Sequence, residues 1–107
     1  MTAAQIGTGH VLQGRVRSAS NCAPVAGAVV VLWQAGPDGY GLRGRGRVLT
    51  DRSGDFASRA RSPANYGRGP HIHIAVFHRA YEELLTPYVV RRGAKTGRIR
   101  LVLAPLL

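Results

Sequence analysis

Short apolar segments separated by turn-forming residues run through the whole chain. Segments 10–17 and 98–103 alternate between apolar and polar residues, whereas segment 29–33 is a continuous apolar run. Alternation at every second position predicts a half-buried strand, and a continuous run of this length predicts a buried central strand. Further strands are predicted at segments 47–50, 55–59, 71–77 and 86–90.

Turn-forming residues occupy the intervals between these strands. Segments 18–24 and 36–39 are polar or rich in Gly and Pro, and Asp51–Gly54 is expected to close a hairpin between its flanking strands. Segment 81–85 is read either as a single helical turn or as the start of a strand. About seven short strands with closely spaced turn signals predict an all-β fold, an antiparallel β-sandwich of immunoglobulin-like or prealbumin-like type.

Length and composition predict the number of domains and the cellular compartment. A chain of 107 residues with 45% hydrophobic content is expected to form one domain, 1–107. No apolar run approaches the length of a membrane span, and the first residues lack the pattern of a signal peptide. The single Cys22 cannot form an intrachain disulfide. These features predict a cytoplasmic protein, and no role is expected for Cys22.

The net charge of +10 comes from fifteen basic residues, of which only Lys95 is a lysine, against five acids. Such a balance raises the question of nucleic-acid binding. However, the arginines are spread along the chain, and no row of aromatic residues offers a platform for bases. This argues against nucleic acid as a partner. An arginine-rich pocket for an anionic or phenolic substrate, or a general compositional bias, explains the charge equally well.

The densest cluster of reactive side chains is segment 66–73, which contains a phenol, a guanidinium and two imidazoles. In a strand, residues two apart share one face and lie about 6.6 Å apart, so His71 and His73 can both reach one metal ion. Ile72, Ile74 and Val76 would then form a hydrophobic backing on the other face. The alternative is a pair of surface histidines on a strand edge.

The order of several motifs resembles the intradiol ring-cleaving dioxygenases over about residues 10–90, and the protocatechuate type more than the catechol type. The motifs that specify strands and turns are shared with metal-free transthyretin-like sandwiches, and they include Gly14-x-Val16, Pro24-Val25-Ala26-Gly27-Ala28 and Thr50-Asp51-x-x-Gly54-x-Phe56. The discriminating motifs are Trp33-Gln34, Gly39-Tyr40 and Arg68-x-x-His71-Ile72-His73.

The resemblance implies that Tyr40, Tyr66, His71 and His73 are the protein ligands of a non-haem Fe(III). A phenolate is a hard anionic donor, so two phenolates with two imidazoles favour a trivalent iron. The remaining candidates have no motif support. Tyr81 and Tyr88 are interpreted as packing residues, and the sequence identifies no partner for His10 or His78.

The resemblance also implies an activity. A catechol-type diol would bind the iron, Tyr66 would leave the metal and accept a substrate proton, and O2 would be used to cleave the ring between the hydroxylated carbons. Arg68 would stabilise the charge that develops on the substrate.

Two departures from the family pattern leave alternatives open. The loop between Tyr66 and His71 is short, and Pro87 replaces a glutamine expected after Thr86. A different reaction on a larger polycyclic substrate, or a metal-free binding sandwich, therefore remains an alternative. A homo-oligomer is expected because the tail 101–107 is rich in apolar residues.

Overall fold

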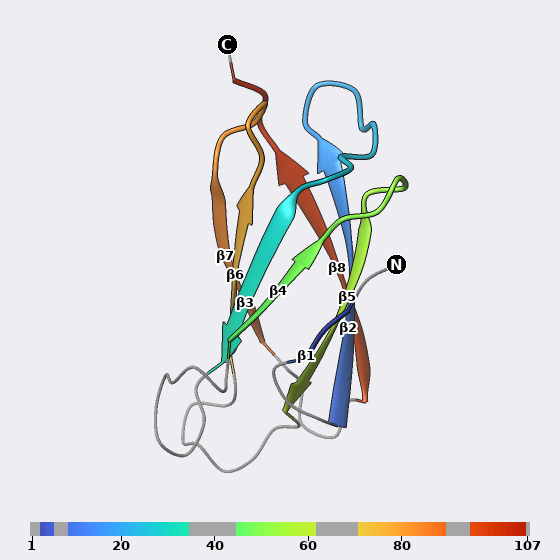
Figure 1. Ribbon diagram of the computed structural model, residues 1–107, viewed down its shortest axis with the longest axis vertical. Helices are drawn as coiled ribbons and strands as arrows, with labels where there is room; N and C mark the ends of the chain where they lie inside the picture. Colours follow the sequence, from blue (N-terminus) through green and yellow to red (C-terminus); the bar gives the residue numbers. More distant parts are fainter. Residues whose placement is uncertain (1–2, 6–8, 35–44, 62–70, 90–94, 107) are drawn as a thin grey trace.

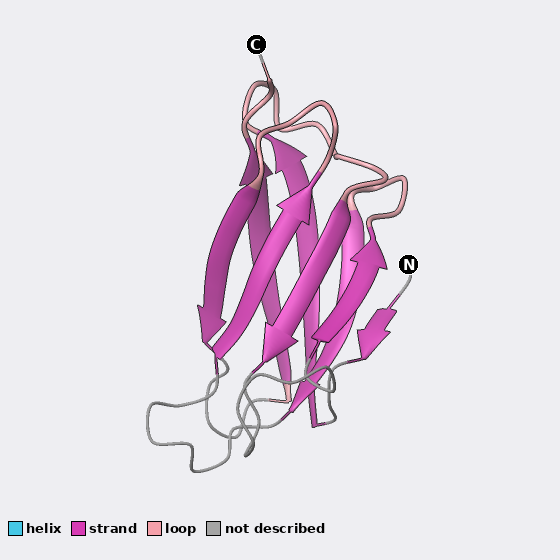
Figure 2. Cartoon of the chain, turned by 60° about the vertical axis from the view of Figure 1, so that its left-hand side comes forward, coloured by secondary structure: helices cyan, strands magenta, loops and turns pink. Residues whose placement is uncertain are grey.

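The computed structural model describes residues 3–5, 9–34, 45–61, 71–89 and 95–106, and it gives only the backbone for residues 3–5, 9, 34, 45, 60, 61 and 71. The described residues form eight strands in two four-stranded sheets packed face to face (Figures 1 and 2). One sheet, called the β2 sheet, has the order β1 (Ala3–Gln5), β5 (Asp55–Arg61), β2 (Gly9–Ser18), β8 (Thr96–Leu103). The other, called the β3 sheet, has the order β4 (Arg45–Leu49), β3 (Val29–Gln34), β6 (His71–Phe77), β7 (Leu84–Val89).

The predicted β-sandwich is confirmed, but its pairing is antiparallel throughout only in the β3 sheet. In the β2 sheet, β8 runs parallel to β2 and β1 runs parallel to β5. Strand β8 enters this sheet directly after β7, which belongs to the opposite sheet, and it lies beside a strand from the start of the chain. Alternation within a segment fixes the buried face of a strand but not the direction of its neighbour, so the parallel pairs were not predicted.

The predicted hairpin around Asp51–Gly54 is wrong, although the turn itself is present. The Gly54 amide donates to the Asp51 carbonyl at 2.9 Å, and Gly54 has a φ of +73° that favours glycine. The turn joins β4 in the β3 sheet to β5 in the β2 sheet, so it crosses between the layers. Val48 and Phe56, on either side of the turn, are both buried and reach the core from opposite sheets.

Segment 81–85 contains no helix. Tyr81 forms an isolated bridge with Pro105, and the following strand begins at Leu84. Nowhere in the described residues is there a helix long and apolar enough to cross a membrane.

The core lies between the two sheets and is filled from alternate positions of each strand. Leu12 and Val16 of β2 face Val30 and Leu32 of β3, and all four side chains are fully buried. Several further apolar side chains complete the core, namely Phe56, Ile72, Ile74, Val76, Leu101 and Leu103. The apolar tail therefore contributes Leu101 and Leu103 to its own sandwich.

The buried Thr50 stabilises the connection between β4 and β5, which crosses from one sheet to the other. Its hydroxyl donates to the Val25 carbonyl at 2.7 Å and accepts from the Ala28 amide at 2.9 Å. Next to it, the Asp51 carboxylate accepts from the amides of Asp55 and Ser53, and these bonds hold the pKa of Asp51 below its usual value. This motif thus specifies a turn, as the sequence predicts.

Replacing Thr50 by Val should lower the free energy of unfolding by about 2–4 kcal/mol, because it leaves one buried carbonyl and one buried amide without their hydroxyl partner. Chemical denaturation monitored by circular dichroism measures this change. The matched control is Thr86→Val, since the Thr86 hydroxyl makes only a 3.4 Å contact with the Pro87 carbonyl. Equal losses in the two variants would contradict this role for Thr50.

Candidate metal centre

The two histidines predicted to share a strand face are the first and third residues of β6. The intervening Ile72 and the following Ile74 are fully buried, which places His73 on the outer face of the sheet, whereas only the backbone of His71 is described. The predicted hydrophobic backing is confirmed. Strand β6 lies between β3 and β7, so the histidines are not on a strand edge and that alternative is wrong.

The half-buried His73 ring is held by Trp33. Trp33 lies directly across from His73 in the register of β3 and β6, and the two rings stack with centroids 5.5 Å apart at an interplanar angle of 15°. Offset stacking of this kind stabilises a ring pair by about 0.5–1.5 kcal/mol beyond area burial. Trp33 therefore restricts the orientation of the imidazole.

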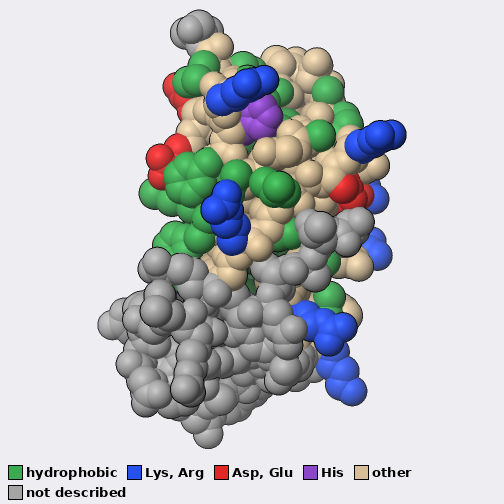
Figure 3. Space-filling view, in the orientation of Figure 1, with side chains coloured by type: hydrophobic (Ala, Val, Ile, Leu, Met, Phe, Trp, Pro, Cys, Tyr) green, Lys and Arg blue, Asp and Glu red, His purple; other side chains and the backbone are tan. Residues whose placement is uncertain are grey.

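The surface around these histidines is apolar on β3, β6 and β7, and on β4 it is bordered by Arg47 and Arg45, which lie opposite Val31 and Trp33. On the outer face of the β3 sheet, His73 lies between Trp33 and Pro87, and His71 lies opposite Val89. Neighbouring positions on this face hold further apolar side chains, which are Val29, Val31, Leu49, Ala75, Phe77 and Leu85. We call this set the apolar face. Figure 3 shows hydrophobic side chains gathered at the left of the view, where Figure 1 draws β6 and β7.

Pro87, one of the two departures from the family pattern, lies directly opposite His73. Its strand β7 is at the edge of the sheet, where the missing amide hydrogen of a proline is tolerated. The position expected to carry a glutamine thus lies beside His73 and offers no hydrogen-bond donor.

Tyr40, Tyr66 and Arg68 lie outside the described residues, as do the turn at 36–39 and the short loop before His71. The described strands nevertheless show where these segments attach. Strands β3 and β5 end, and β4 and β6 begin, at the same end of the sandwich, the lower end in Figure 1. Among described residues, no three His, Cys, Asp or Glu side chains are grouped to hold a metal.

One buried polar pair was missed by sequence reasoning. His10 is fully buried on the inner face of β2, and its Nε2 lies 3.3 Å from the hydroxyl of Tyr88 on β7. The pair bridges the two sheets, and a Cβ at the adjacent Gly97 would overlap the Tyr88 hydroxyl. The alternation of segment 10–17 indicates that His10 points inward, but only the tertiary structure identifies its partner.

Tyr81 and Tyr88 pack against the core, as predicted. His78 makes an edge-to-face contact with Tyr81 at a centroid distance of 5.2 Å, and its Nδ1 accepts from the Ala80 amide at 3.0 Å. These residues therefore have contacts with other described parts of the chain.

The chain is similar in sequence to the chlorocatechol 1,2-dioxygenase of Pseudomonas sp. strain P51. The two are 31% identical over an alignment of 111 positions. The alignment includes 78% of this chain and 44% of that relative. The chain thus spans less than half the length of the curated relative that it matches. No protein-family model matches the chain.

Solved structures share the fold. The hydroxyquinol 1,2-dioxygenase from Pseudomonas putida DLL-E4 superposes with a TM-score of 0.73 at 18% identity, over 94% of this chain and 57% of that one. The catechol 1,2-dioxygenase from Acinetobacter radioresistens superposes with a TM-score of 0.76 at 15% identity, over 100% of this chain and 58% of that one. The dioxygenase domain of a dioxygenase and carbohydrate-binding fusion from Streptomyces sp. SirexAA-E superposes with a TM-score of 0.76 at 21% identity, over 95% of this chain and 87% of that one.

The resemblance to the intradiol ring-cleaving dioxygenases is therefore confirmed, in sequence over part of a relative and in the fold of the whole sandwich. The relative in sequence is a chlorocatechol 1,2-dioxygenase, and the structures that share the fold include a hydroxyquinol and a catechol 1,2-dioxygenase. The identities to the solved structures are too low to carry more than the fold.

Replacing Trp33 by Leu should lower the free energy of unfolding by about 1 kcal/mol more than replacing it by Phe, because only Phe keeps an aromatic ring over His73. The second readout is the proton NMR signal of the His73 ring, which is expected upfield under the indole ring current. This signal should move downfield in the Leu variant and stay close to its position in the Phe variant. An unchanged signal in both variants would contradict the stack.

Proposed function

We propose that the chain binds one non-haem Fe(III) and uses O2 to cleave a catechol-type diol between its hydroxylated carbons. The observation that carries this proposal is the half-buried His73 on the internal strand β6, two residues after His71, beside the strand ends from which the tyrosine-bearing segments leave. The similarity to a chlorocatechol 1,2-dioxygenase over part of that enzyme supports the assignment.

The donor set fits this metal. Tyr40, Tyr66, His71 and His73 would supply two phenolate oxygens and two imidazole nitrogens, a combination that suits a hard trivalent ion better than softer divalent ones. Fe(III), when bound, would favour ionisation of both diol hydroxyls and increase the reactivity of the ring toward O2. His73 is already oriented by Trp33, which reduces the entropy lost when the metal binds.

The protein side chains would then bind, orient and deprotonate the diol. The apolar face adjoining His73 offers a surface against which an aromatic ring would pack. Tyr66 would accept a proton from one diol hydroxyl at its phenolate oxygen. Arg68, three residues before His71, would place a guanidinium where negative charge develops on the substrate.

A second candidate function is a different oxidation at the same metal site, on a larger polycyclic diol. The observation that favours it is Pro87 opposite His73, since a proline cannot supply the hydrogen-bond donor that a glutamine would place beside the metal ligand. The two functions differ in their products, because only intradiol cleavage incorporates both atoms of O2 into one dicarboxylate.

The iron site is tested by metal content and colour. The purified protein should hold about one iron per chain and absorb visible light, because phenolate-to-Fe(III) charge transfer gives a red to purple band. Tyr40→Phe and Tyr66→Phe should each shift or bleach this band, whereas Tyr81→Phe is the control and should leave it unchanged. A colourless, iron-free protein from iron-replete cells would favour a metal-free binding sandwich.

The reaction is tested on the same preparations by oxygen uptake with catechols of increasing size, followed by mass spectrometry of products formed under ¹⁸O2. Arg68→Ala should keep the iron and its colour but lower turnover by about 10²–10³-fold, as removal of one transition-state donor does. Arg79→Ala, on an exposed turn, is the control. Consumption of no diol by an iron-loaded protein would overturn ring cleavage.

We also propose that a second copy of the chain covers the apolar face. The apolar tail supports an oligomer only in part, because Leu101 and Leu103 are buried in the core of their own chain while Val102 and Leu106 are exposed. Exposed apolar side chains instead gather near the histidines, with Leu85 65% and Val89 54% exposed. A second chain over this face would supply the wall that the short loop before His71 leaves out.

Sedimentation velocity at micromolar concentration should therefore show a dimer or larger assembly, and Leu85→Glu should dissociate it. Val102→Glu is the matched control, since Val102 is 45% exposed on the β2 sheet. A monomeric wild-type protein would rule out the oligomer, and dissociation by both variants would place the interface elsewhere.

A further inference from the structure

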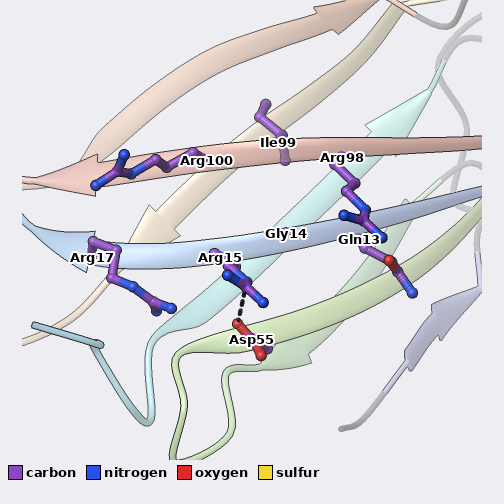
Figure 4. A pocket seen from close by; sticks show the side chains of 8 residues that line it. All are labelled: Gln13, Gly14, Arg15, Arg17, Asp55, Arg98, Ile99 and Arg100. Carbon is purple, nitrogen blue, oxygen red and sulfur yellow. Dashed lines mark ion pairs between the residues drawn. The ribbon is translucent and has the colours of Figure 1, made fainter. Parts of the chain in front are cut away.

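Five arginines that are distant in the sequence meet on the outer face of the β2 sheet. Arg15 lies opposite Arg100, and Gln13 lies opposite Arg98, in the parallel register of β2 and β8. Arg17 follows on β2, and Arg59 of β5 lies opposite Val11. We call Arg15, Arg17, Arg59, Arg98 and Arg100 the arginine face. Figure 4 shows four of these side chains along a shallow groove of about 590 Å³.

This positive charge is poorly neutralised within the described part of the chain. Asp55 is the acid on this face, and its Oδ1 lies 3.5 Å from Arg15 Nε, too far for a short charge-assisted hydrogen bond. The same oxygen is buried and has no hydrogen-bond partner among described residues. Arg17 donates to the Ser53 carbonyl at 2.7 Å, which fixes its position but leaves its charge uncompensated.

The face carries an excess of positive charge in the absence of a ligand. The register places Arg15 and Arg100 opposite each other, but their guanidinium groups point apart, with Arg15 paired to Asp55 and Arg100 lying 3.9 Å from the sulfur of Cys22 (Figure 4). Five arginines against one acid on the described part of this face are a reason to look for an anionic partner, since a surface that needed only solubility could alternate charges of both signs.

The groove is separate from the candidate metal centre. The arginine face belongs to the β2 sheet and the histidines to the β3 sheet, with the core between them. The arginine face is therefore not the wall of a pocket for the ring-cleavage substrate, whereas Arg45 and Arg47 lie on the same sheet as His73.

The spread of the arginines over neighbouring strands favours a polymer over a small anion. Successive outward positions on a strand lie about 6.6 Å apart and neighbouring strands about 4.8 Å apart, so the arginine face is an elongated strip. An exposed ion pair contributes only about 0–1 kcal/mol, which leaves a small anion weakly bound. A polyanion that neutralises several arginines at once gains from the release of its counterions.

The absence of aromatic side chains distinguishes between nucleic acids. The described positions of the arginine face and its groove carry no Phe, Tyr or Trp, so unpaired bases would find nothing to stack on. In a duplex the bases are already stacked and the phosphates face outward. We propose that the arginine face binds the phosphate backbone of duplex nucleic acid, without reading its sequence. The register of the strands brings together arginines that are scattered in the sequence, which supplies the cluster that the sequence alone lacks.

The test measures the binding of the full-length protein to a fluorescein-labelled DNA duplex of about 20 base pairs by fluorescence anisotropy. A dissociation constant of about 10⁻⁴–10⁻⁶ M is expected near physiological salt, and three to five phosphate contacts predict a slope of log K against log salt of about −3 to −4.5. The double variant Arg98→Gln/Arg100→Gln should bind at least about 10-fold more weakly, with a slope shallower by about 2.

The matched control is Arg47→Gln/Arg79→Gln, which removes the same charge from exposed residues outside the β2 sheet and should change the affinity by less than about 2-fold. An equal loss in the control would show that net charge alone drives binding and would overturn the proposal. Tighter binding of a single strand than of the duplex, or competition by poly-glutamate as effective as that by unlabelled duplex, would also overturn it. Iron content and oxygen uptake are independent of these outcomes.

Discussion

The alternation of side chains along each strand, imposed by burial between two sheets, is the constraint on which the other features depend. Each strand must direct one set of residues into the core, because Leu12, Val30 and Ile74 cannot be exposed without losing their burial energy. The other set is then left on an outer face. The two outer faces differ in character. One carries His73 among apolar side chains, with Arg45 and Arg47 on its β4 side, and the other carries five arginines.

Much of the fold could be predicted because local patterns specify local structure. The strands at segments 10–17, 29–33 and 98–103, and the burial of Ile72, Ile74 and Val76, follow from alternation and composition. What could not be predicted is which strands become neighbours. A turn such as Asp51–Gly54 has the same local chemistry whether it closes a hairpin or crosses between sheets, because its hydrogen bonds are internal to the turn.

The candidate site shows the same division. The shared face of His71 and His73 was predictable from strand geometry, and the resemblance to the intradiol dioxygenases supplied Tyr40, Tyr66 and Arg68 as candidates. The stack of Trp33 on His73 required the register of β3 and β6, and the place of Pro87 beside His73 required that of β6 and β7. The His10 and Tyr88 pair required the spacing between the sheets. Each of these depends on contacts between residues far apart in the sequence.

The parallel pairing of β2 with β8 has a consequence for biosynthesis. Strand β8 follows β2 only after five intervening strands, so β2 cannot acquire this neighbour until the chain as far as β8 has left the ribosome. Until then one side of β2 presents unpaired amides and carbonyls, a surface open to pairing with other nascent chains. Pairing that spans most of the sequence also closes slowly, since a long loop must be ordered first. Completion of the β2 sheet during synthesis is thus limited by the emergence of β8.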